Sequence, residues 1–269
     1  MSRKTKFTIL LQGGLGNQLF GWAAAESLAL KNNGTVQFSE RFLQPGQFEL
    51  SKYTRAPKST EENIGALWLR TKVFKERDFR FDERFNVINT GVTLKGYFQS
   101  WKYFSDHQDH IRQTFSTIAN TSEQYEIFLQ DLEREPYTAI HIRRGDYVGL
   151  TSYHGLTSRD YFAKAKDVLA KYRNAERVVV FSDDIDAAKD LVDWGNLYIG
   201  KHDLENSVET LDLMSRATNL VGSNSSFSWW AAYLNDNNSG IRIMPRPWFA
   251  NSDLNDRDLL CPNWLSLGI

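Results

Sequence analysis

The 269-residue chain has a single cysteine, Cys261, so it can form no internal disulfide and no thiolate metal cluster. No long apolar run occurs: even the segment 227–234 is interrupted by Ser228, far short of the about 18 residues of a membrane-spanning helix. Neither sign of charge is in excess, since 32 Lys and Arg stand against 33 Asp and Glu, and this balance argues against a nucleic-acid partner. These absences predict a soluble, cytoplasmic protein.

The composition is typical of a globular protein, with 41% hydrophobic and 24% charged residues. Short apolar runs alternate with segments of helical period, which predicts an α/β fold with parallel strands joined by helical crossovers. The expected strands are 7–11, 35–38, 92–97, 139–142, 177–181, 196–199, 219–221 and 241–243. The expected helices are 18–31, 103–115, 123–134, 158–172, 184–194, 207–217 and 227–235.

A domain boundary is expected at the charged run 133–135, which Pro136 closes just before a new strand. The predicted domains are 1–135 and 136–269, and each begins with a strand that leads into a polar, glycine-containing loop. The segment 41–89 has mixed charge, scattered aromatics and poor periodicity, so its fold is not predicted.

The first candidate site is the loop 12–18, which lies between the first strand and the first long helix. Its glycines let the backbone approach a ligand, and the helix N-terminus favours anions. The loop has Gly14 and Gly16 but not the third glycine of the dinucleotide fingerprint, which disfavours NAD. The sequence also has no phosphate-binding Gly-x4-Gly-Lys-Ser/Thr motif, which disfavours ATP. Asn17 and Gln18 add polar side chains to what could otherwise be a simple tight turn.

The second candidate site follows the strand 139–142, where an apolar run ends in His-x-Arg-Arg-x-Asp. We expect Arg143 to bind a diphosphate, because a guanidinium stays charged and donates parallel hydrogen bonds to phosphate oxygens. Arg144 and Asp146 are expected to form a structural ion pair, and His141 shares a strand face with Arg143. The alternative is that the whole cluster is a structural salt-bridge network.

Acidic residues follow the strand 177–181 and form the third candidate. Asp183 is the expected ligand residue, since its carboxylate can accept hydrogen bonds from a base or a ribose. Asp184 and Asp186 are expected to cap and charge the next helix. They also form an Asp-x-Asp sequence, which some glycosyltransferases use to hold a divalent metal against a sugar nucleotide.

The fourth candidate follows the strand 219–221, where Asn224, Ser225 and Ser226 precede an aromatic helix. Free backbone N–H groups and hydroxyls can converge there on a phosphate. Plain N-capping by a serine is the alternative reading. Trp229 and Trp230 are expected in the core.

Four motifs therefore stand in order along the chain: Gly13–Phe20 (GGLGNQLF), His141–Tyr147 (HIRRGDY), Phe181–Asp184 (FSDD) and Asn224–Ala232 (NSSFSWWAA). In sequence and order they resemble the motifs of the α-1,2-fucosyltransferases, glycosyltransferase family 11. One departure is Gly21-Trp22, where members of that family often carry Gln and an aromatic residue or Met.

The resemblance implies a GT-B fold, in which two Rossmann-like domains face each other across a cleft. It further implies that GDP-fucose is held mostly by the C-terminal domain and that fucose is transferred with inversion to the 2-hydroxyl of a terminal β-galactoside, with no essential metal and no cofactor. Arg143 would then hold the diphosphate with His141 beside it, Asp183 would meet the guanosine, and Ser225 and Ser226 would bind phosphate. Gly16 and Asn17 would close the cleft from the other domain.

On this basis the expected site residues fall into two groups. The donor-binding set is Gly14, Gly16, Asn17, Gln18, Arg143, Asp183, Asn224, Ser225 and Ser226. The catalytic pair is Arg143 and His141, and the residues indicate no general base.

The resemblance makes the acceptor a galactose-terminated oligosaccharide, lipid-linked at the inner membrane surface, where Arg3, Lys4 and Lys6 would assist peripheral docking. Aromatic side chains could support a sugar ring or belong to the core: Phe98, Trp101, Tyr103, Tyr147 and Tyr153, with His154 beside them. Two other functions stay open, a metal-dependent glycosyltransferase that uses Asp184 and Asp186, and a non-catalytic sugar-nucleotide binding module.

Overall fold

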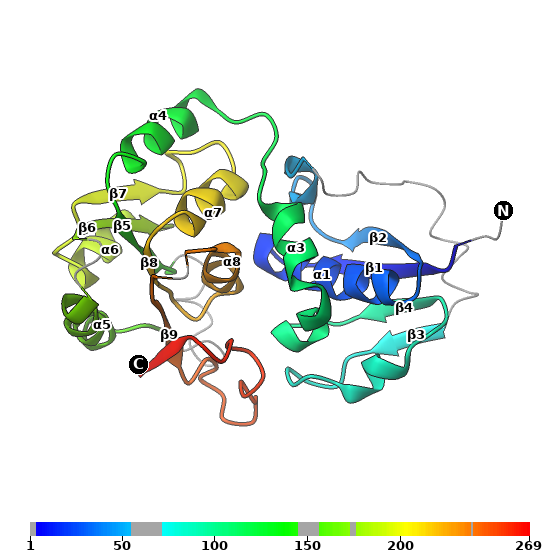
Figure 1. The fold of residues 1–269 in the computed structure, drawn as a ribbon. Coiled ribbons are helices and arrows are strands. Elements are labelled where there is room, and N and C mark those ends of the chain that lie inside the picture. The colour runs from blue at the N-terminus through cyan, green and yellow to red at the C-terminus, as the bar shows by residue number, and fades with distance from the viewer. Residues whose placement is uncertain (1–3, 55–71, 145–155, 173–175, 238) are drawn as a thin grey trace. The chain divides into compact units, whose positions relative to one another are not determined.

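The computed structural model describes residues 4–54, 72–144, 156–172, 176–237 and 239–269 (Figure 1). The chain forms two compact units. The first comprises Met1–Thr117 and Asn255–Cys261, and the second comprises Ile118–Leu254 and Pro262–Ile269. Both units are built on a parallel sheet, as the alternation of strands and helices in the sequence predicts.

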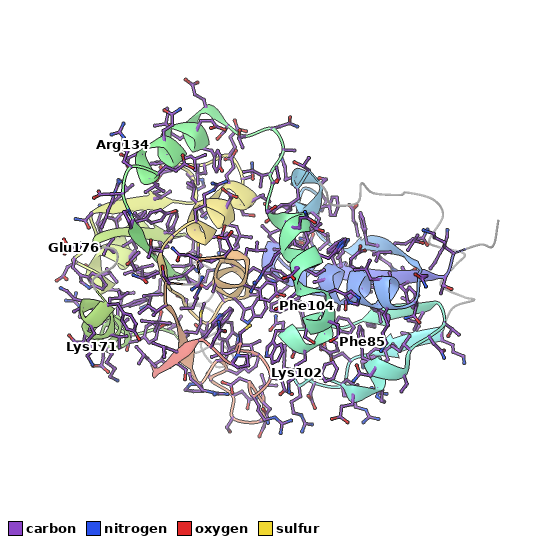
Figure 2. All side chains as sticks on the ribbon, viewed as in Figure 1. Phe85, Lys102, Phe104, Arg134, Lys171 and Glu176 are labelled. Carbon is purple, nitrogen blue, oxygen red and sulfur yellow. The ribbon has the colours of Figure 1, made fainter. Side chains whose placement is uncertain are left out.

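The sheet of the first unit has the strand order β2-β1-β4-β3. Its strands are β1 (Lys6–Gln12), β2 (Thr35–Phe42), β3 (Lys72–Lys75) and β4 (Val92–Lys95). Its helices are α1 (Leu15–Lys31) and α3 (Gln108–Phe115), with 3-10 turns η1 (Leu50–Lys52), η2 (Glu83–Val87), η3 (Trp101–Tyr103) and η4 (Ser105–His107). Helix α1 is buried around most of its circumference, and the buried rings of Phe85 and Phe104 belong to the core of this unit (Figure 2).

The sheet of the second unit has the strand order β10-β9-β8-β5-β6-β7. Its strands are β5 (Tyr137–Ile142), β6 (Arg177–Ser182), β7 (Leu197–Gly200), β8 (Asn219–Val221), β9 (Arg242–Arg246) and β10 (Leu265–Gly268). Its helices are α4 (Glu123–Leu132), α5 (Arg159–Tyr172), α6 (Ile185–Leu191), α7 (Ser207–Ser215) and α8 (Ser226–Leu234).

Strand β5 is buried along its whole length, and its side chains alternate between the two faces of the sheet. Ile140 and Ile142 pack with Tyr161 and Phe162 of α5 in one core cluster. His141 points to the opposite face, where it meets Ser228 of α8. The two faces are thus covered by different helices, while Arg134, Lys171 and Glu176 lie on the surface of the unit (Figure 2).

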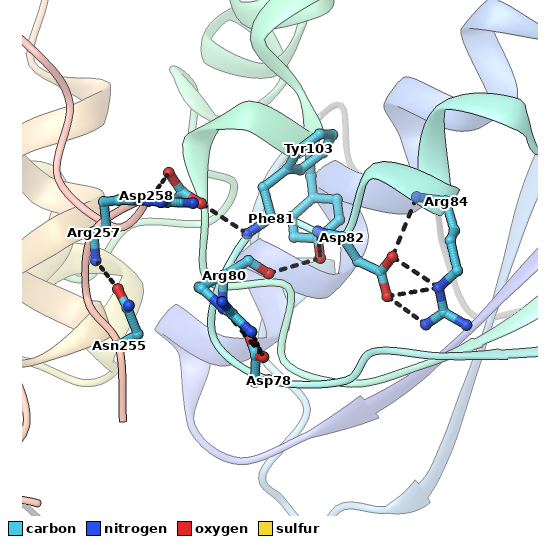
Figure 3. Close-up of polar contacts among 9 residues, drawn as sticks. All are labelled: Asp78, Arg80, Phe81, Asp82, Arg84, Tyr103, Asn255, Arg257 and Asp258. Carbon is cyan, nitrogen blue, oxygen red and sulfur yellow. Dashed lines mark hydrogen bonds and ion pairs between the residues drawn. The ribbon is translucent and has the colours of Figure 1, made fainter. Parts of the chain in front are cut away.

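The segment Asn255–Cys261 joins the first unit through Asp258, which is 4% exposed. The Asp258 carboxylate accepts a hydrogen bond from the Phe81 backbone N–H (3.2 Å) and pairs with Lys102 (2.6 Å). Ser100 donates its hydroxyl proton to the Asp258 backbone carbonyl (2.7 Å). Figure 3 shows the Asp258 carboxylate with the Phe81 N–H, and also the hydrogen bond from the Asp82 backbone N–H to the Tyr103 hydroxyl.

The two units divide between Thr117 and Ile118, upstream of the boundary expected before Pro136. Helix α4 belongs with the second unit because Ser122 at its N-terminus is bonded to Glu209 of α7, through its backbone N–H (2.7 Å) and its hydroxyl (3.0 Å). Local charge and proline content could not reveal these bonds, which join residues far apart in the chain.

All eight expected strands are present, and the expected α/β fold is confirmed. Strands β3 and β10 were not expected, and the expected helix 103–115 begins only at Gln108. Phe104 and His107 adopt non-helical backbone angles and divide the earlier part of that segment into η3 and η4. Within the described residues, no helix is long and apolar enough to cross a membrane.

Candidate active site

The chain order around β5 defines a ligand-binding position in the second unit. The chain passes from β5 to β6 and β7 on one side, and then returns to β8 on the other side of β5. Open parallel sheets bind ligands outside the carboxyl ends of their strands at such a reversal of strand order. The carboxyl ends of β5 and β8 lead into Arg143 and into the segment 222–226, so two of the sequence-predicted motifs meet there.

Ser223 joins the two loops at this position. Its hydroxyl donates to the His141 backbone carbonyl (2.7 Å) and accepts from the Arg143 backbone N–H (3.1 Å). Ser223 is fully buried, so its hydroxyl depends on these internal partners. It therefore fixes the backbone of Arg143 relative to the loop that precedes α8.

The Ser223→Ala variant is expected to lose about 1–3 kcal/mol of stability, because it leaves the Arg143 N–H and a carbonyl without this partner. Activity is expected to fall as well, since the backbone that carries Arg143 loses its support. Urea unfolding and initial rates would measure the two effects, with Ser215→Ala on α7 as a control serine. An unchanged rate in a folded variant would remove Ser223 from the support of Arg143.

His141 is a buried, neutral imidazole. Its side chain lies against Phe227, and its Nδ1 is 2.6 Å from the Ser228 hydroxyl. Burial, followed by the positive charge of Arg143, lowers the pKa of His141 to about 3. Because Ser228 already accepts the Ser223 N–H (3.1 Å), we assign its hydroxyl proton to Nδ1 and the ring proton to Nε2. His141 can therefore donate one N–H but carries no positive charge at neutral pH.

Arg143 is held by a buried carboxylate. Its Nη1 is 3.1 Å from Oδ2 of Asp183, whose side chain is 8% exposed, whereas the Arg143 side chain is 34% exposed. The other oxygen of Asp183 accepts the Arg144 backbone N–H (2.9 Å). A carboxylate fixed by burial and a backbone bond thus orients a guanidinium that solvent still reaches. The expected contact of Asp183 with a guanosine stays a prediction.

Arg144 uses its guanidinium internally, donating to the Thr157 backbone carbonyl (2.9 Å). Burial is the main cause that lowers the pKa of Arg144. Its expected ion-pair partner, Asp146, lies outside the described residues. Arg144 therefore makes an internal contact, while the expected contact of Arg143 with a diphosphate stays a prediction.

Serines at the start of α8 cap the helix. Ser225 is the N-cap and its hydroxyl accepts the Phe227 N–H (3.3 Å), which confirms the capping reading. Asn224 is 2% exposed and donates from its side chain to the Trp248 carbonyl (3.1 Å). Ser226 opens the helix and is partly exposed. The N-terminus of a helix favours an anion, although the Phe227 N–H is already bonded to Ser225, and phosphate binding by Ser225 and Ser226 stays a prediction.

Asp184 is the N-cap of α6, and its carboxylate accepts the Ala187 N–H (3.0 Å), as expected. In the part of the chain that the structure describes, no group of three or more His, Cys, Asp and Glu side chains could hold a metal ion. The capping bond is therefore the observed role of Asp184. Trp229 and Trp230 are fully buried, which confirms that they belong to the core.

The glycine loop of the first unit occupies the equivalent position after β1. Gly13 has φ +70°, and a Cβ at this residue would lie 2.5 Å from Nδ2 of Asn17. Gly14 is the N-cap of α1. Gln18 is fully buried, and its amide donates to the carbonyls of Gly13 (3.0 Å) and Gln47 (2.7 Å). These contacts make Gln18 a support of the loop, and its expected role as a ligand stays a prediction.

Asn17 is held by a residue that sequence reasoning missed. Its Oδ1 accepts a hydrogen bond from Nε2 of Gln99 (2.7 Å), which follows β4. Phe98 and Tyr103 are almost fully buried, so the idea that these two rings support a sugar is wrong. Trp101 is partly exposed. Tyr147, Tyr153 and His154 lie outside the described residues.

Three supporting residues were missed for a common reason: Gln99, Ser223 as the bridge between two loops, and Ser228 as the partner of His141. Each acts on a residue that is distant along the chain. The only available signal was their position, just after an expected strand or within a motif.

Two units, each built on a parallel sheet with a polar loop at its reversal of strand order, have the GT-B type of fold. The model of glycosyl transferase family 11 matches residues 1–268, and the chain belongs to this family.

Curated relatives and a solved structure agree with this family. The chain is 28% identical to the O-antigen biosynthesis glycosyltransferase WbnK of Escherichia coli, over 96% of this chain and 99% of the relative. It is 29% identical to an alpha-1,2-colitosyltransferase of Escherichia coli, over 96% and 97% of the two chains. It is 26% identical to the galactoside 2-alpha-L-fucosyltransferase SEC1 of Bos taurus, over 85% of this chain and 64% of the relative.

A crystal structure of NodZ alpha-1,6-fucosyltransferase soaked with GDP-fucose has the same fold, with a TM-score of 0.57 and 14% identity over 86% of this chain and 93% of that chain. The expected GT-B class is thereby confirmed.

Proposed function

We propose that this enzyme transfers fucose from GDP-fucose, with inversion, to the 2-hydroxyl of a terminal β-galactoside. The observation that carries the proposal is the guanidinium of Arg143, which buried Asp183 holds at the reversal of strand order in the second unit. A fixed, partly exposed positive charge at this position suits the diphosphate of a sugar nucleotide. Relatives that are named as galactoside 2-alpha-L-fucosyltransferases support the choice of donor and acceptor.

The charge that develops in the reaction explains the proposed roles. Breaking the bond between fucose and phosphate leaves an oxocarbenium-like sugar and builds negative charge on the departing GDP. Arg143 would stabilise that charge, together with the first N–H groups of α8 and the Nε2 proton of His141. We propose that these donors replace an essential metal ion. The 2-hydroxyl of the acceptor forms the new bond to the fucose carbon as the bond to GDP breaks, and its proton passes to solvent, because no side chain among the described residues is assigned as a general base.

We propose that the remaining expected residues bind substrate as follows. Asp183 meets the guanosine in addition to orienting Arg143, while Asn224, Ser225 and Ser226 bind phosphate through hydroxyl and backbone groups. Gly14, Gly16 and Asn17 present backbone and amide groups to a substrate. The acceptor is proposed to be a galactose-terminated, lipid-linked oligosaccharide that the enzyme meets in the cytoplasm at the inner membrane surface, in keeping with a relative named for O-antigen biosynthesis.

Fucose transfer from GDP-fucose to a panel of β-galactosides, with and without EDTA, tests the donor, the reaction and the metal together. We expect GDP release and an α-1,2-linked product, with the same rate in EDTA. Loss of activity in EDTA that Mn²⁺ or Mg²⁺ restores would contradict the metal-free mechanism and favour the use of Asp184 and Asp186. Binding of GDP without turnover of any acceptor would indicate a sugar-nucleotide binding module instead.

A colitose donor is the second candidate, because an alpha-1,2-colitosyltransferase is 29% identical over nearly the whole of both chains. Direct competition between GDP-fucose and GDP-colitose, with one acceptor, separates the two donors. A higher kcat/KM for GDP-colitose would replace fucose by colitose in the proposed reaction and leave the role of Arg143 unchanged.

A further inference from the structure

The first unit has its own reversal of strand order, between β1 and β4. The chain passes from β1 to β2 on one side, and β4 then lies on the other side of β1. The glycine loop follows β1 and the segment Gly96–Gln99 follows β4, so both loops leave neighbouring parallel strands at the same edge. The bond between Gln99 and Asn17 (2.7 Å) joins them.

The turn after β4 is held by Glu76, which directly follows β3. One carboxylate oxygen of Glu76 accepts hydrogen bonds from the backbone N–H groups of Tyr97 (2.8 Å) and Phe98 (2.9 Å). Gly96 leaves room for this side chain, since a Cβ there would lie 2.5 Å from the Glu76 Cβ. Beyond the end of β4 the N–H groups of Tyr97 and Phe98 have no neighbouring strand to bond to, and the Glu76 carboxylate accepts their hydrogen bonds instead.

Phe98 adopts a backbone conformation that needs such a clamp. Its φ is +54°, which is rare for a bulky L-residue. Its fully buried ring packs against Phe74, Phe85 and Tyr103. The left-handed turn at Phe98 sets the direction of the next residue, Gln99, toward Asn17.

The second carboxylate oxygen of Glu76 is buried and has no hydrogen-bond partner among the described residues. Burial is the main cause that raises the pKa of Glu76, to about 7, while the Tyr103 hydroxyl from η3 lowers it and Asp78 on its own segment raises it. A buried carboxylate costs free energy unless hydrogen bonds satisfy it, and the bonds from the Tyr97 and Phe98 N–H groups hold Glu76 to the turn.

We propose that Glu76 is a positioning residue for the transfer reaction: by clamping the turn at Phe98 it aims Gln99, and Gln99 in turn fixes the Asn17 amide beside Gly13 in the glycine loop. This inference rests on the proposed function, because it gives the glycine loop a part in the reaction. Glu76 acts only through the turn and makes no contact with a substrate.

A double-mutant cycle tests this chain of contacts. Glu76→Ala and Gln99→Ala are each expected to lower kcat/KM by about tenfold, the equivalent of one hydrogen bond, and the double variant is expected to be no slower than the slower single variant. Glu76→Gln keeps an acceptor oxygen and is expected to restore most of the rate. The exposed Glu83→Gln on η2 is the matched control and is expected to behave as wild type. Multiplying effects in the double variant would overturn the proposal.

A second readout does not depend on the identity of the donor or on the folding of the alanine variant. In ¹⁵N-labelled protein, the side-chain amide signals of Asn17 and Gln99, assigned through Asn17→Asp and Gln99→Glu, are expected to shift with a midpoint near pH 7. Glu76→Gln is expected to abolish that titration. Amide signals that titrate identically in wild type and Glu76→Gln would overturn the proposal. A wild-type enzyme that ignores GDP-fucose yet shows the titration would contradict only the proposed function.

Discussion

Replacing Arg143 with alanine is expected to reduce fucose transfer by about 100- to 1000-fold, the usual cost of removing one donor that stabilises developing charge. The guanidinium lies at the carboxyl end of β5, is partly exposed, and is oriented by the buried carboxylate of Asp183 (3.1 Å). Initial rates with GDP-fucose at saturating acceptor would measure the loss. The effect should fall mainly on kcat, because the charge on GDP develops as the bond breaks.

Control variants separate the charge of Arg143 from its geometry. Arg143→Lys keeps the charge but not the planar pair of donors, so an intermediate rate is expected. Asp183→Asn keeps the shape of the carboxylate but removes its charge, and is expected to slow transfer by loosening the guanidinium. Arg159→Ala, which removes an exposed arginine of α5, is the matched control. Near-normal turnover by a folded Arg143→Ala variant would contradict the catalytic role.

Strand positions could be predicted from the sequence because buried parallel strands are continuous apolar runs. The strand Asn219–Val221 was predicted to the residue, and the run that contains Ile140 and Ile142 was found at once. Strand β3 escaped prediction because Lys72–Lys75 contains only two apolar residues, one of them exposed. Strand β10 is likewise mostly exposed, so its sequence carries little pattern.

The site was predicted as four separate loops, and the sheet explains why two of them meet. Charge and residue type indicated Arg143 and the segment that follows Val221, but only the strand order places them on neighbouring strands. The bonds that make these loops one site come from residues of unremarkable type, such as Ser223 and Ser228. A serine hydroxyl has no distinctive sequence signal, so its partner is known only when the fold is known.

The same physics gives the two units opposite dependences of stability on pH. Glu76 has a folded-state pKa of about 7, above its ordinary value of 4.5, so the folded first unit binds the extra proton between these values. Its contribution to stability is therefore present at low pH and is lost as the pH rises from about 4.5 to about 7. His141 contributes with the opposite sign, since its folded-state pKa is depressed.

Acidification from pH 6.5 to pH 3 is expected to destabilise the second unit through His141 by up to about 5 kcal/mol. The unfolded imidazole takes up a proton near pH 6.5, whereas the buried ring does so only near pH 3, so the unfolded state is favoured as the pH falls through this window. Above pH 6.5 the contribution is constant. Urea unfolding at a series of pH values would measure how the free energy of unfolding changes with pH. Carboxylates also titrate in this range, but they contribute equally to wild type and to a variant of His141, so a comparison of the two isolates the histidine.

His141→Gln supplies that comparison, because glutamine can accept a hydrogen bond from Ser228 but has no proton to take up in this range. The variant is expected to be less stable than wild type at pH 7, since its shape fits the site less well, and to lose less stability on acidification. His202→Gln, which changes an exposed histidine of the same unit, should keep the wild-type slope. Equal slopes for wild type and His141→Gln would mean that the pKa of His141 is the same in the folded and the unfolded protein, and would contradict the lowered pKa of the buried ring.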